Sequence, residues 1–212
     1  HALLFFLLLI NLLVWYSVFS YSQEKLKIIA CDVGQGDAFL ITFKDFQILI
    51  DGGPDSKVLN CLSDNMPFWD RSVEVVILSH PQKDHFAGLM KVFENYNVGY
   101  FLTTPLDSGS VEWKVLKDLV GGSRTEVINP GEGDKYRCGL IYLDILYPPN
   151  ADLSAIPTVF QTDDSMGVMG AYTSAKDPNE FSLVLLLSFK DFDALFTGDI
   201  NPGISDKIAE QL

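Results

Sequence analysis

The sequence predicts a layered α/β domain, in which helices pack on a mixed β-sheet. Strand-like apolar segments first follow one another with only short turns between them, over residues 26–50. From residue 56 onward, strand-like segments alternate with segments whose apolar residues have helical spacing. The chain has 212 residues, which is long enough to bury a full core without disulfide staples. Hairpins followed by strand–helix alternation indicate a mixed sheet with helices packed on it.

The N-terminal segment differs in composition from the rest. Residues 1–23 contain no Asp, Glu, Lys or Arg and are almost wholly apolar. A transmembrane helix needs about 20 such residues, so we predict a transmembrane anchor here, followed by one domain over residues 24–212. A cleaved signal peptide is the alternative, with Ser20-Tyr21-Ser22 as a weak cleavage site. Because the chain begins with His1 and not Met, we also expect a missing upstream part.

The first part of the domain is predicted to be an antiparallel meander. Its strands cover residues 26–31, 38–43 and 47–50. The first turn is Gly34-Gln35-Gly36-Asp37, and the third strand ends at the strong breaker Asp51-Gly52-Gly53-Pro54.

Alternating elements follow the meander. A helix over residues 56–64 leads to a buried strand over 73–79, and a second helix over 84–95 has one apolar face. The remaining predicted elements are a strand at 100–103, a helix at 111–120, strands at 125–128 and 140–146, a long loop at 148–178, a hairpin at 182–188 and 193–197, and a helix from 203.

Charge and cysteine content restrict the function classes. The formal net charge of −13 argues against a broad basic surface for nucleic acid. It does not exclude a phosphodiester substrate, because bound dications would invert the local field. Cys31, Cys61 and Cys138 are scattered and form no C-x-x-C pair, so neither a zinc ribbon nor a disulfide framework is indicated. We expect Cys31 to be a small buried apolar residue.

The segment from His80 to His85 is the main candidate for a functional site. It holds two of the three histidines and Asp84, on a loop that follows the predicted strand over residues 73–79. Open α/β sheets place ligand sites at the C-terminal ends of strands. Imidazole with carboxylate suits zinc, manganese or iron. The alternative is a pair of ordinary loop histidines, with His85 in a structural role at a helix start.

Aspartates recur at the ends of the predicted strands. They are Asp32, Asp37, Asp51, Asp84 and Asp199. A single aspartate at such a position is usually a turn former or a helix cap. Several of them around a His-x-x-x-Asp-His loop instead indicate a metal site.

The ordered set of these motifs resembles the metallo-β-lactamase-fold domain of ComEC-type DNA-internalisation competence proteins. Each motif is weak alone, but their common order over residues 26 to about 208 is specific. The matching segments are Asp32-Val33-Gly34-Gln35-Gly36-Asp37, Leu49-Ile50-Asp51-Gly52-Gly53, Leu78-Ser79-His80 through Asp84-His85, Asn179-Glu180-Phe181-Ser182-Leu183-Val184, and Thr197-Gly198-Asp199-Ile200.

The resemblance implies an αβ/βα sandwich, truncated at the C-terminus before a later histidine motif, so this fragment would be catalytically incomplete. It implies a membrane-attached hydrolase with one or two divalent metal ions, zinc or manganese, and no dinucleotide cofactor. The implied substrate is DNA or another phosphodiester, cleaved during DNA uptake. The domain would lie on the extracytoplasmic side of the membrane. The oligomeric state is not predicted.

The resemblance also assigns roles to residues. His80, Asp84 and His85 match the ligand motif, Asp199 completes the metal site, and Asp84 and Asp199 are the expected catalytic residues. Asp51 would orient the histidine loop from behind the ligands. The expected pocket residues are Asp37, Gln82, Asn179 and Ser182. Asn179 and Ser182 have a local structural role as the alternative.

One position departs from the family motif. Gln82 stands where the motif has its second histidine. An amide oxygen is a poor zinc ligand, so one site would be weak or suited to a harder ion such as manganese. Two alternatives therefore stay open. One is a non-catalytic metal-binding or structural module of a DNA-uptake channel, and the other is a metallo-hydrolase of a lactam, thioester or lactone.

Overall fold

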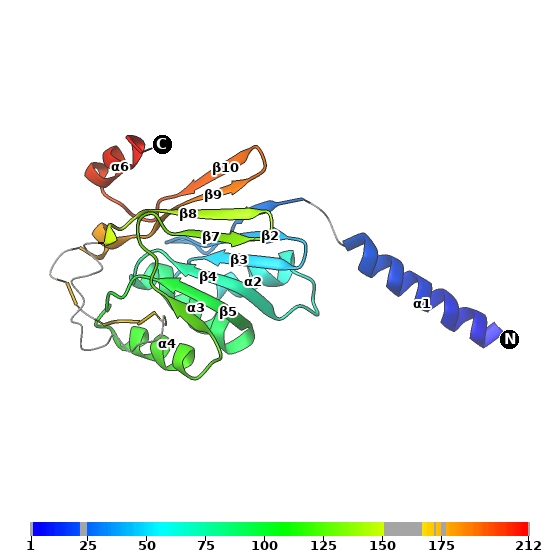
Figure 1. Ribbon diagram of the computed structural model, residues 1–212. Coiled ribbons are helices and arrows are strands. Elements are labelled where there is room, and N and C mark those ends of the chain that lie inside the picture. Colours follow the sequence, from blue (N-terminus) through cyan, green and yellow to red (C-terminus); the bar gives the residue numbers. More distant parts are fainter. Residues whose placement is uncertain (1, 22–24, 151–166, 172, 175–176, 212) are drawn as a thin grey trace.

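The computed structural model describes residues 2–21, 25–150, 167–171, 173–174 and 177–211. Helix α1 (Ala2–Tyr21) precedes the domain and extends away from it (Figure 1). Among the described residues, no helix meets both the length and the apolarity that crossing a membrane requires, and the transmembrane helix predicted for residues 1–23 is not confirmed.

The first half of the domain forms a six-stranded sheet in the order β1 to β6 within the described residues. Its strands are β1 (Lys27–Ala30), β2 (Phe39–Phe43), β3 (Phe46–Ile50), β4 (Ser72–Leu78), β5 (Asn97–Thr103) and β6 (Glu126–Ile128). Strands β1 to β3 pair antiparallel, which confirms the predicted meander, and β3 to β6 pair parallel. The crossovers of the parallel part contain α2 (Lys57–Asn65), α3 (Lys83–Asn95) and α4 (Val111–Gly121).

The second half forms an antiparallel sheet in the order β10-β9-β8-β7. Its strands are β7 (Lys135–Cys138), β8 (Ile141–Tyr147), β9 (Val184–Phe189) and β10 (Phe192–Phe196). Strand β7 was not predicted, because it is short and two of its four residues are charged. Only Tyr136 and Cys138 of β7 pack against the core.

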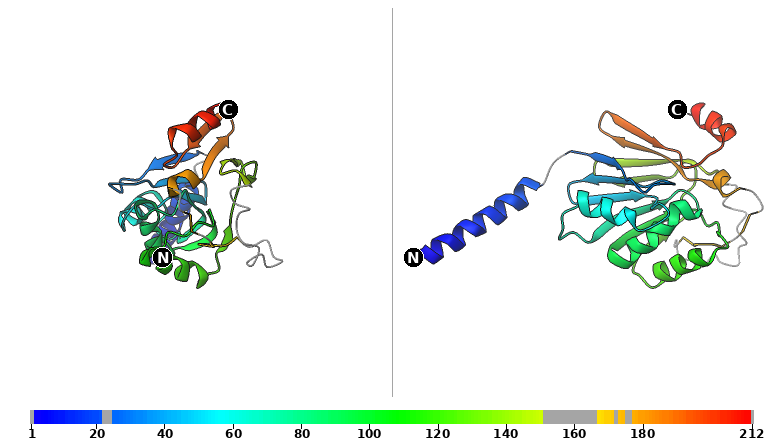
Figure 2. Two further views of the ribbon diagram at one scale, coloured as in Figure 1. Left: turned by 90° about the vertical axis from the view of Figure 1, so that its left-hand side faces the viewer. Right: turned by 180° about the vertical axis from the view of Figure 1, so that it is seen from behind.

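The described elements form four layers (Figures 1 and 2). Helices α2 to α4 cover the outer face of the first sheet through a core that includes Leu49, Phe86 and Trp113. The two sheets face each other across a second core. Helix α6 (Pro202–Ala209) packs on the outer face of the second sheet through Ile204 and Ile208. The αβ/βα sandwich is confirmed. The residue pattern predicted only one mixed sheet, whereas the structure has a second sheet that covers the other face of the first.

Strand β3 shows why the strands of the first sheet have almost continuous apolar sequences. Successive side chains of a strand point to opposite faces, and both faces of this sheet are buried. Leu49 therefore contributes to the helix-side core, and Ile48 and Ile50 to the core between the sheets. Because β3 and β4 are parallel neighbours, Asp51 and Ser79, which follow them, meet at one edge of the sheet.

A disulfide joins Cys31 to Cys61. The expectation that Cys31 is simply a small buried apolar residue, with no disulfide indicated, is therefore wrong. The two cysteines are 30 positions apart, and the fold brings the end of β1 beside α2. The pair could not be predicted from the sequence, because the two cysteines come together only in the folded chain and their spacing matches no known motif. Cys138 is a free, half-buried thiol, and burial raises its pKa.

The long loop predicted at residues 148–178 falls mostly outside the described residues. Its end is described and contains the 3-10 helix η2 (Pro178–Phe181), which leads into β9. The backbone N–H of Leu183 donates to the carbonyl of Ser79 over 2.8 Å. This bond fastens the start of β9 to the end of β4 and brings the second sheet to the histidine loop.

Candidate metal centre

The two histidines of the central motif come from the junction between β4 and α3. His80 follows the end of β4, and His85 lies in the first turn of α3. Both are almost fully buried, with His80 0% and His85 1% exposed. Their ring centroids lie 4.2 Å apart, so the loop brings both imidazoles to one place.

The carboxylate of Asp51 contacts His85 directly and reaches His80 through Ser79. Its Oδ1 accepts a hydrogen bond from the backbone N–H of Ser79 over 2.8 Å, and its Oδ2 accepts one from the Ser79 hydroxyl over 2.7 Å. The same Oδ2 lies 2.9 Å from Nδ1 of His85. Asp51 is 1% exposed and has a positive φ of 56°, an uncommon backbone conformation for a residue with a side chain. Asp51 therefore contacts the histidine loop, and its role in orienting metal ligands stays a prediction.

These hydrogen bonds fix the tautomers of both rings. The Ser79 hydroxyl has a single proton and gives it to Asp51, so at its 3.0 Å contact it accepts from Nδ1–H of His80. Nδ1–H of His85 donates to Asp51. In the neutral form both histidines then carry their free lone pair on Nε2. Both Nε2 atoms are buried and have no hydrogen-bond partner among the described residues.

Asp199 completes a three-residue group at these nitrogens. It follows β10 on the second sheet, and its Oδ2 lies 3.5 Å from Nε2 of His85. One ligand atom each from His80, His85 and Asp199 lie within 4.8 Å of one another. Gly198 has a φ of 52°, and a Cβ there would lie 3.0 Å from the Cβ of Ser79. A glycine is required at this position, because the β10 end passes so close to the β4 end.

Asp84 lies beside this group but is not part of it. Its Oδ2 accepts a 3.4 Å hydrogen bond from the Gln35 amide. A Cβ at Gly36 would lie 1.9 Å from the carbonyl oxygen of Asp84, so the turn after β1 packs directly on the start of α3. The role of Asp84 as a ligand stays a prediction.

The carboxylates shape the protonation of the histidines. Burial alone would lower the pKa of His85, but the hydrogen bond and charge of Asp51, helped by the charge of Asp199, raise it to about 9. Burial, together with the neighbouring positive charge of His85, lowers the pKa of His80. Burial also raises the pKa of Asp37, and the charge of Asp51 adds to this effect. Without a cation, the proton on His85 offsets part of the negative charge gathered here.

Gln82 contacts both the centre and η2. Its side chain makes a polar contact with His80 that acts to raise the pKa of that histidine, against the larger effect of burial. The Nε2 of Gln82 donates to Oδ1 of Asn179 over 2.6 Å, which ties the N-cap of α3 to η2. Ser182 is fully buried, its hydroxyl has no hydrogen-bond partner in the described part of the chain, and it contacts the site through Gly198. The structure therefore brings these predicted pocket residues to the border of the centre.

Sequence reasoning missed three contributors: Ser79, Gln35 and Gly198. Ser79 was read as the last residue of a buried strand. A hydroxyl directly before His80 was the available signal for its bridging role. Gln35 and Gly198 were quoted within motifs without a role, because their contacts join segments far apart in the chain.

The donor set fits a divalent cation. Two imidazole nitrogens face inward without partners, and one carboxylate lies beside them, with its side chain 44% exposed. Catalytic zinc sites have three protein ligands of these types and an open position for water or substrate. The group His80, His85 and Asp199 could therefore hold an ion on a side that solvent reaches.

Comparisons with known proteins identify the family and the fold. The family model of the metallo-beta-lactamase superfamily matches residues 31–207. The metallo-beta-lactamase fold protein YhfI from Bacillus subtilis has a similar structure, with 15% identity and a TM-score of 0.50 over 82% of this chain and 61% of YhfI. A Cronobacter sakazakii metallo-beta-lactamase with a HARLDQ motif has 12% identity and a TM-score of 0.48, over 88% of this chain and 67% of that protein.

These structural likenesses concern the fold alone, and the chain spans about three fifths of the length of YhfI. The matches do not distinguish a competence-protein branch. Because the family model covers most of the chain, including the histidine loop and Asp199, the chain belongs to the metallo-β-lactamase superfamily.

Proposed function

We propose that this chain is a metal-dependent hydrolase whose substrate is a phosphodiester, with DNA as the first candidate. One observation carries the hydrolase part: two buried Nε2 atoms, which have no hydrogen-bond partner among the described residues, lie beside the carboxylate of Asp199. A bound dication would activate water and offset charge that builds on the substrate oxygens. The preference for DNA rests on the ordered motifs that resemble competence proteins.

The residues of the chain would act as follows. Asp51 and Ser79 hold the two imidazoles with Nε2 toward the centre, so no reorientation is needed when a cation binds. Asp199, on the second sheet, is the exposed member of the group and therefore the one nearest to an entering substrate. Asp37 lies beside the centre, and burial raises its pKa.

Metal content tests the proposal directly. The purified chain is expected to retain zinc or manganese after dialysis, as measured by elemental analysis. His85→Ala and Asp199→Ala should each lower that content. The matched control is Asp32→Ala, which also alters a strand-end aspartate but lies outside the three-residue group. Equal metal content in all these variants would contradict the assigned ligands.

Cleavage of single-stranded DNA tests the substrate. The activity should need added manganese or zinc and should disappear with His80→Ala. Metal binding without cleavage of any phosphodiester would instead favour a non-catalytic metal-binding module. The glutamine at position 82 supports that second candidate, because it leaves the centre with one imidazole fewer than the family motif.

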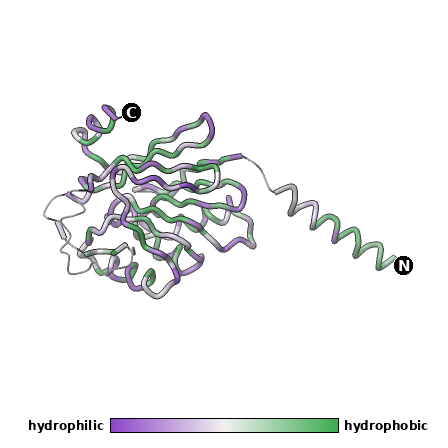
Figure 3. Tube along the Cα trace, viewed as in Figure 1, coloured by the Kyte–Doolittle hydropathy of each residue, from purple (hydrophilic) through white to green (hydrophobic). Residues whose placement is uncertain are grey.

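We also propose that α1 attaches the domain to a membrane on its extracytoplasmic side. Residues 2–17 of α1 are exposed and, apart from Asn11 and Ser17, they are apolar or aromatic. Figure 3 shows this predominantly hydrophobic composition, and such a helix is ordinarily buried in protein or lipid. The Cys31–Cys61 disulfide supports an oxidising compartment. Thiol blocking at cell lysis, followed by mass spectrometry, should recover this pair as a disulfide. Recovery of two free thiols would contradict the extracytoplasmic placement.

A further inference from the structure

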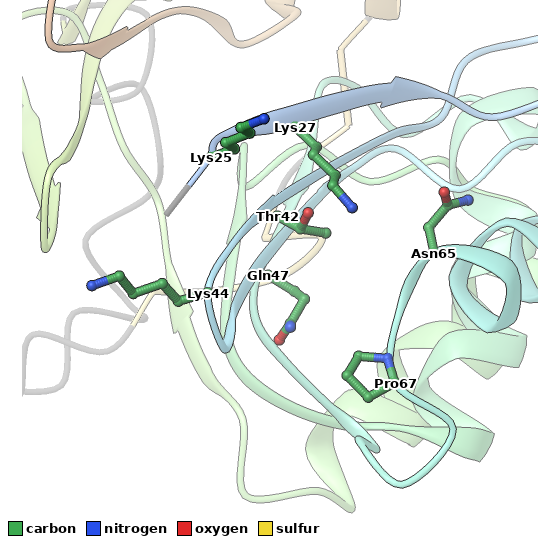
Figure 4. Close-up of a pocket in the computed structure, with 7 residues that line it drawn as sticks. All are labelled: Lys25, Lys27, Thr42, Lys44, Gln47, Asn65 and Pro67. Carbon is green, nitrogen blue, oxygen red and sulfur yellow. The ribbon is translucent and has the colours of Figure 1, made fainter. Parts of the chain in front are cut away.

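A shallow pocket lies at the end of the sandwich opposite to the histidines. It lies between the start of β1, the β2–β3 hairpin and the end of α2 (Figure 4). Gln47, near the start of β3, lines the pocket, whereas Asp51 directly follows the end of that strand. The full lining is Lys25, Lys27, Thr42, Lys44, Gln47, Asn65 and Pro67.

The charge of the pocket is opposite to that of the chain. The protein has a net charge of −13, yet three lysines and no carboxylate are among the described residues that line this pocket. Lys27 extends into the space between Thr42 and Asn65, with Lys25 beside it, whereas the Lys44 ammonium points away from the other lining residues and lies 5.5 Å from the centre of the Phe43 ring (Figure 4). Within the described chain, Lys25 and Lys27 form no ion pair, whereas the four lysines at positions 83, 91, 117 and 135 each contact a carboxylate. The pocket is therefore suited to an anion.

The buried side chain of Gln47 indicates a second property of the ligand, a hydrogen-bond donor. The residue is 1% exposed, and its amide nitrogen donates to Asp70 over 3.3 Å. Its Oε1 is buried and has no hydrogen-bond partner among the described residues. A buried acceptor left unpaired costs about 1–3 kcal/mol, so a ligand here gains by supplying an O–H or N–H as well as a negative charge.

The size of the pocket indicates what kind of ligand fits. Its volume is about 20 Å³, which is room for roughly one water-sized group. A whole metabolite cannot be enclosed in this space. A phosphate oxygen or a hydroxyl can enter it while the bulk of the molecule stays outside, as for the head group of a lipid in a membrane.

The surroundings match a membrane surface. Phe68 and Trp69 follow the lining residue Pro67, are 82% and 52% exposed, and pack edge to face at 4.8 Å. Exposed aromatic rings of this kind are favoured at membrane interfaces. The apolar helix α1 ends only a few residues before Lys25.

We propose that this lysine-lined pocket binds the head group of an anionic phospholipid that carries hydroxyls, such as phosphatidylglycerol. The phosphate contacts Lys25 and Lys27, Lys44 adds a positive charge nearby, and a head-group hydroxyl donates to Oε1 of Gln47. The end of the domain beside α1 then rests on the membrane, and the metal centre faces away from it. This inference deepens the membrane attachment proposed above and rests on it.

Vesicle partitioning of the full chain tests the proposal. Vesicles of phosphatidylcholine alone measure the background from α1, and vesicles of phosphatidylcholine with phosphatidylglycerol add the anionic head group. The ratio of the two partition coefficients should fall about fivefold in Lys27→Ala and roughly a hundredfold when Lys25, Lys27 and Lys44 are all changed to Ala. Partitioning into phosphatidylcholine alone should stay unchanged.

Lys114→Ala is the matched control, because Lys114 is an exposed lysine on α4 and its loss changes the net charge equally. An equal fall in Lys114→Ala would overturn the proposal, since it would reveal a response to net charge only. An unchanged ratio in the triple variant would overturn it as well.

Inorganic phosphate separates the lipid from a soluble ligand. Phosphate that binds the chain in solution, without any preference for phosphatidylglycerol vesicles, would show a free anion site and overturn the lipid assignment. Metal content, measured on the same samples, reports on the opposite end of the domain. The proposed metal function and this inference can therefore fail separately.

Discussion

Strand β3 carries a buried polar side chain near each end, and the two have opposite surroundings. Asp51, after its C-terminal end, has both carboxylate oxygens filled by Ser79 and His85. Gln47, near its start, has a filled amide nitrogen but an empty Oε1 among the described residues. Both side chains are 1% exposed, so the difference does not come from burial.

The difference shows where each end can receive a ligand. At the Asp51 end the polar contacts of the carboxylate are completed within the protein, and the buried Nε2 atoms of the two histidines have no hydrogen-bond partner among the described residues, which suits a cation. At the Gln47 end the buried Oε1 lacks such a partner, Asp70 and Glu74 accept the N–H groups of the residue, and lysines line the pocket beside it, which suits an anion with a donor group. The two ends of the sheet thus differ in the charge of the groups that line the two sites.

The strongest test of this comparison is Asp51→Ala. It leaves Nδ1–H of His85 and two groups of Ser79 without a buried acceptor. Removing one partner of a buried, hydrogen-bonded charge costs about 3–5 kcal/mol, so we expect a fall of this size in the free energy of unfolding. Metal content should fall with it, because the imidazoles lose their fixed orientation. Denaturant unfolding and elemental analysis measure the two effects.

Gln47→Met is the matched control at the other end of the strand. It removes one hydrogen bond to Asp70 and the unpaired oxygen, so the free energy of unfolding should fall by only about 1 kcal/mol. Metal content should not change. If Asp51→Ala kept its metal and lost no more stability than Gln47→Met, the central role of Asp51 would be wrong.

Most of the first sheet, and the place where the candidate metal residues gather, could be predicted from the sequence for one physical reason. The end of a strand can be located from its own apolar sequence. Each of the four residues in and behind the candidate centre lies at or near such a strand end: His80, His85, Asp51 and Asp199. Neighbouring parallel strands then bring such ends together without further information.

What the sequence did not predict depends on contacts between distant segments. The Cys31–Cys61 disulfide, the packing of Gly198 on Ser79 and the second sheet with its short strand β7 are examples. The lysine pocket was also missed, because Lys27 and Lys44 lie on different strands and Asn65 lies on a helix. A pattern read along the chain cannot assemble them.

The disulfide lies on the metal side of the comparison, because Cys31 leads into the turn that packs on Asp84. Replacing both Cys31 and Cys61 by Ser should lower the free energy of unfolding by about 3 kcal/mol, since the bridge closes a loop of this length in the unfolded chain. A reductant should lower the stability of the unmodified protein by the same amount. Cys138→Ser, which removes the free thiol, should keep the full response to reductant, and loss of that response would contradict the pairing.

Gln82→His gives the smallest change in stability and the finest test of the metal end. It exchanges the 2.6 Å bond to Asn179 for an imidazole beside His80, so the free energy of unfolding should change by about 1 kcal/mol. If Gln82 limits the centre to a single ion, Gln82→His should increase the number of bound zinc ions per chain. Asn179→Ala breaks the same hydrogen bond without adding a ligand and should leave that number unchanged. An equal increase in both variants would mean that the tether to η2, and not the missing imidazole, restricts the ions that this edge of the sheet can bind.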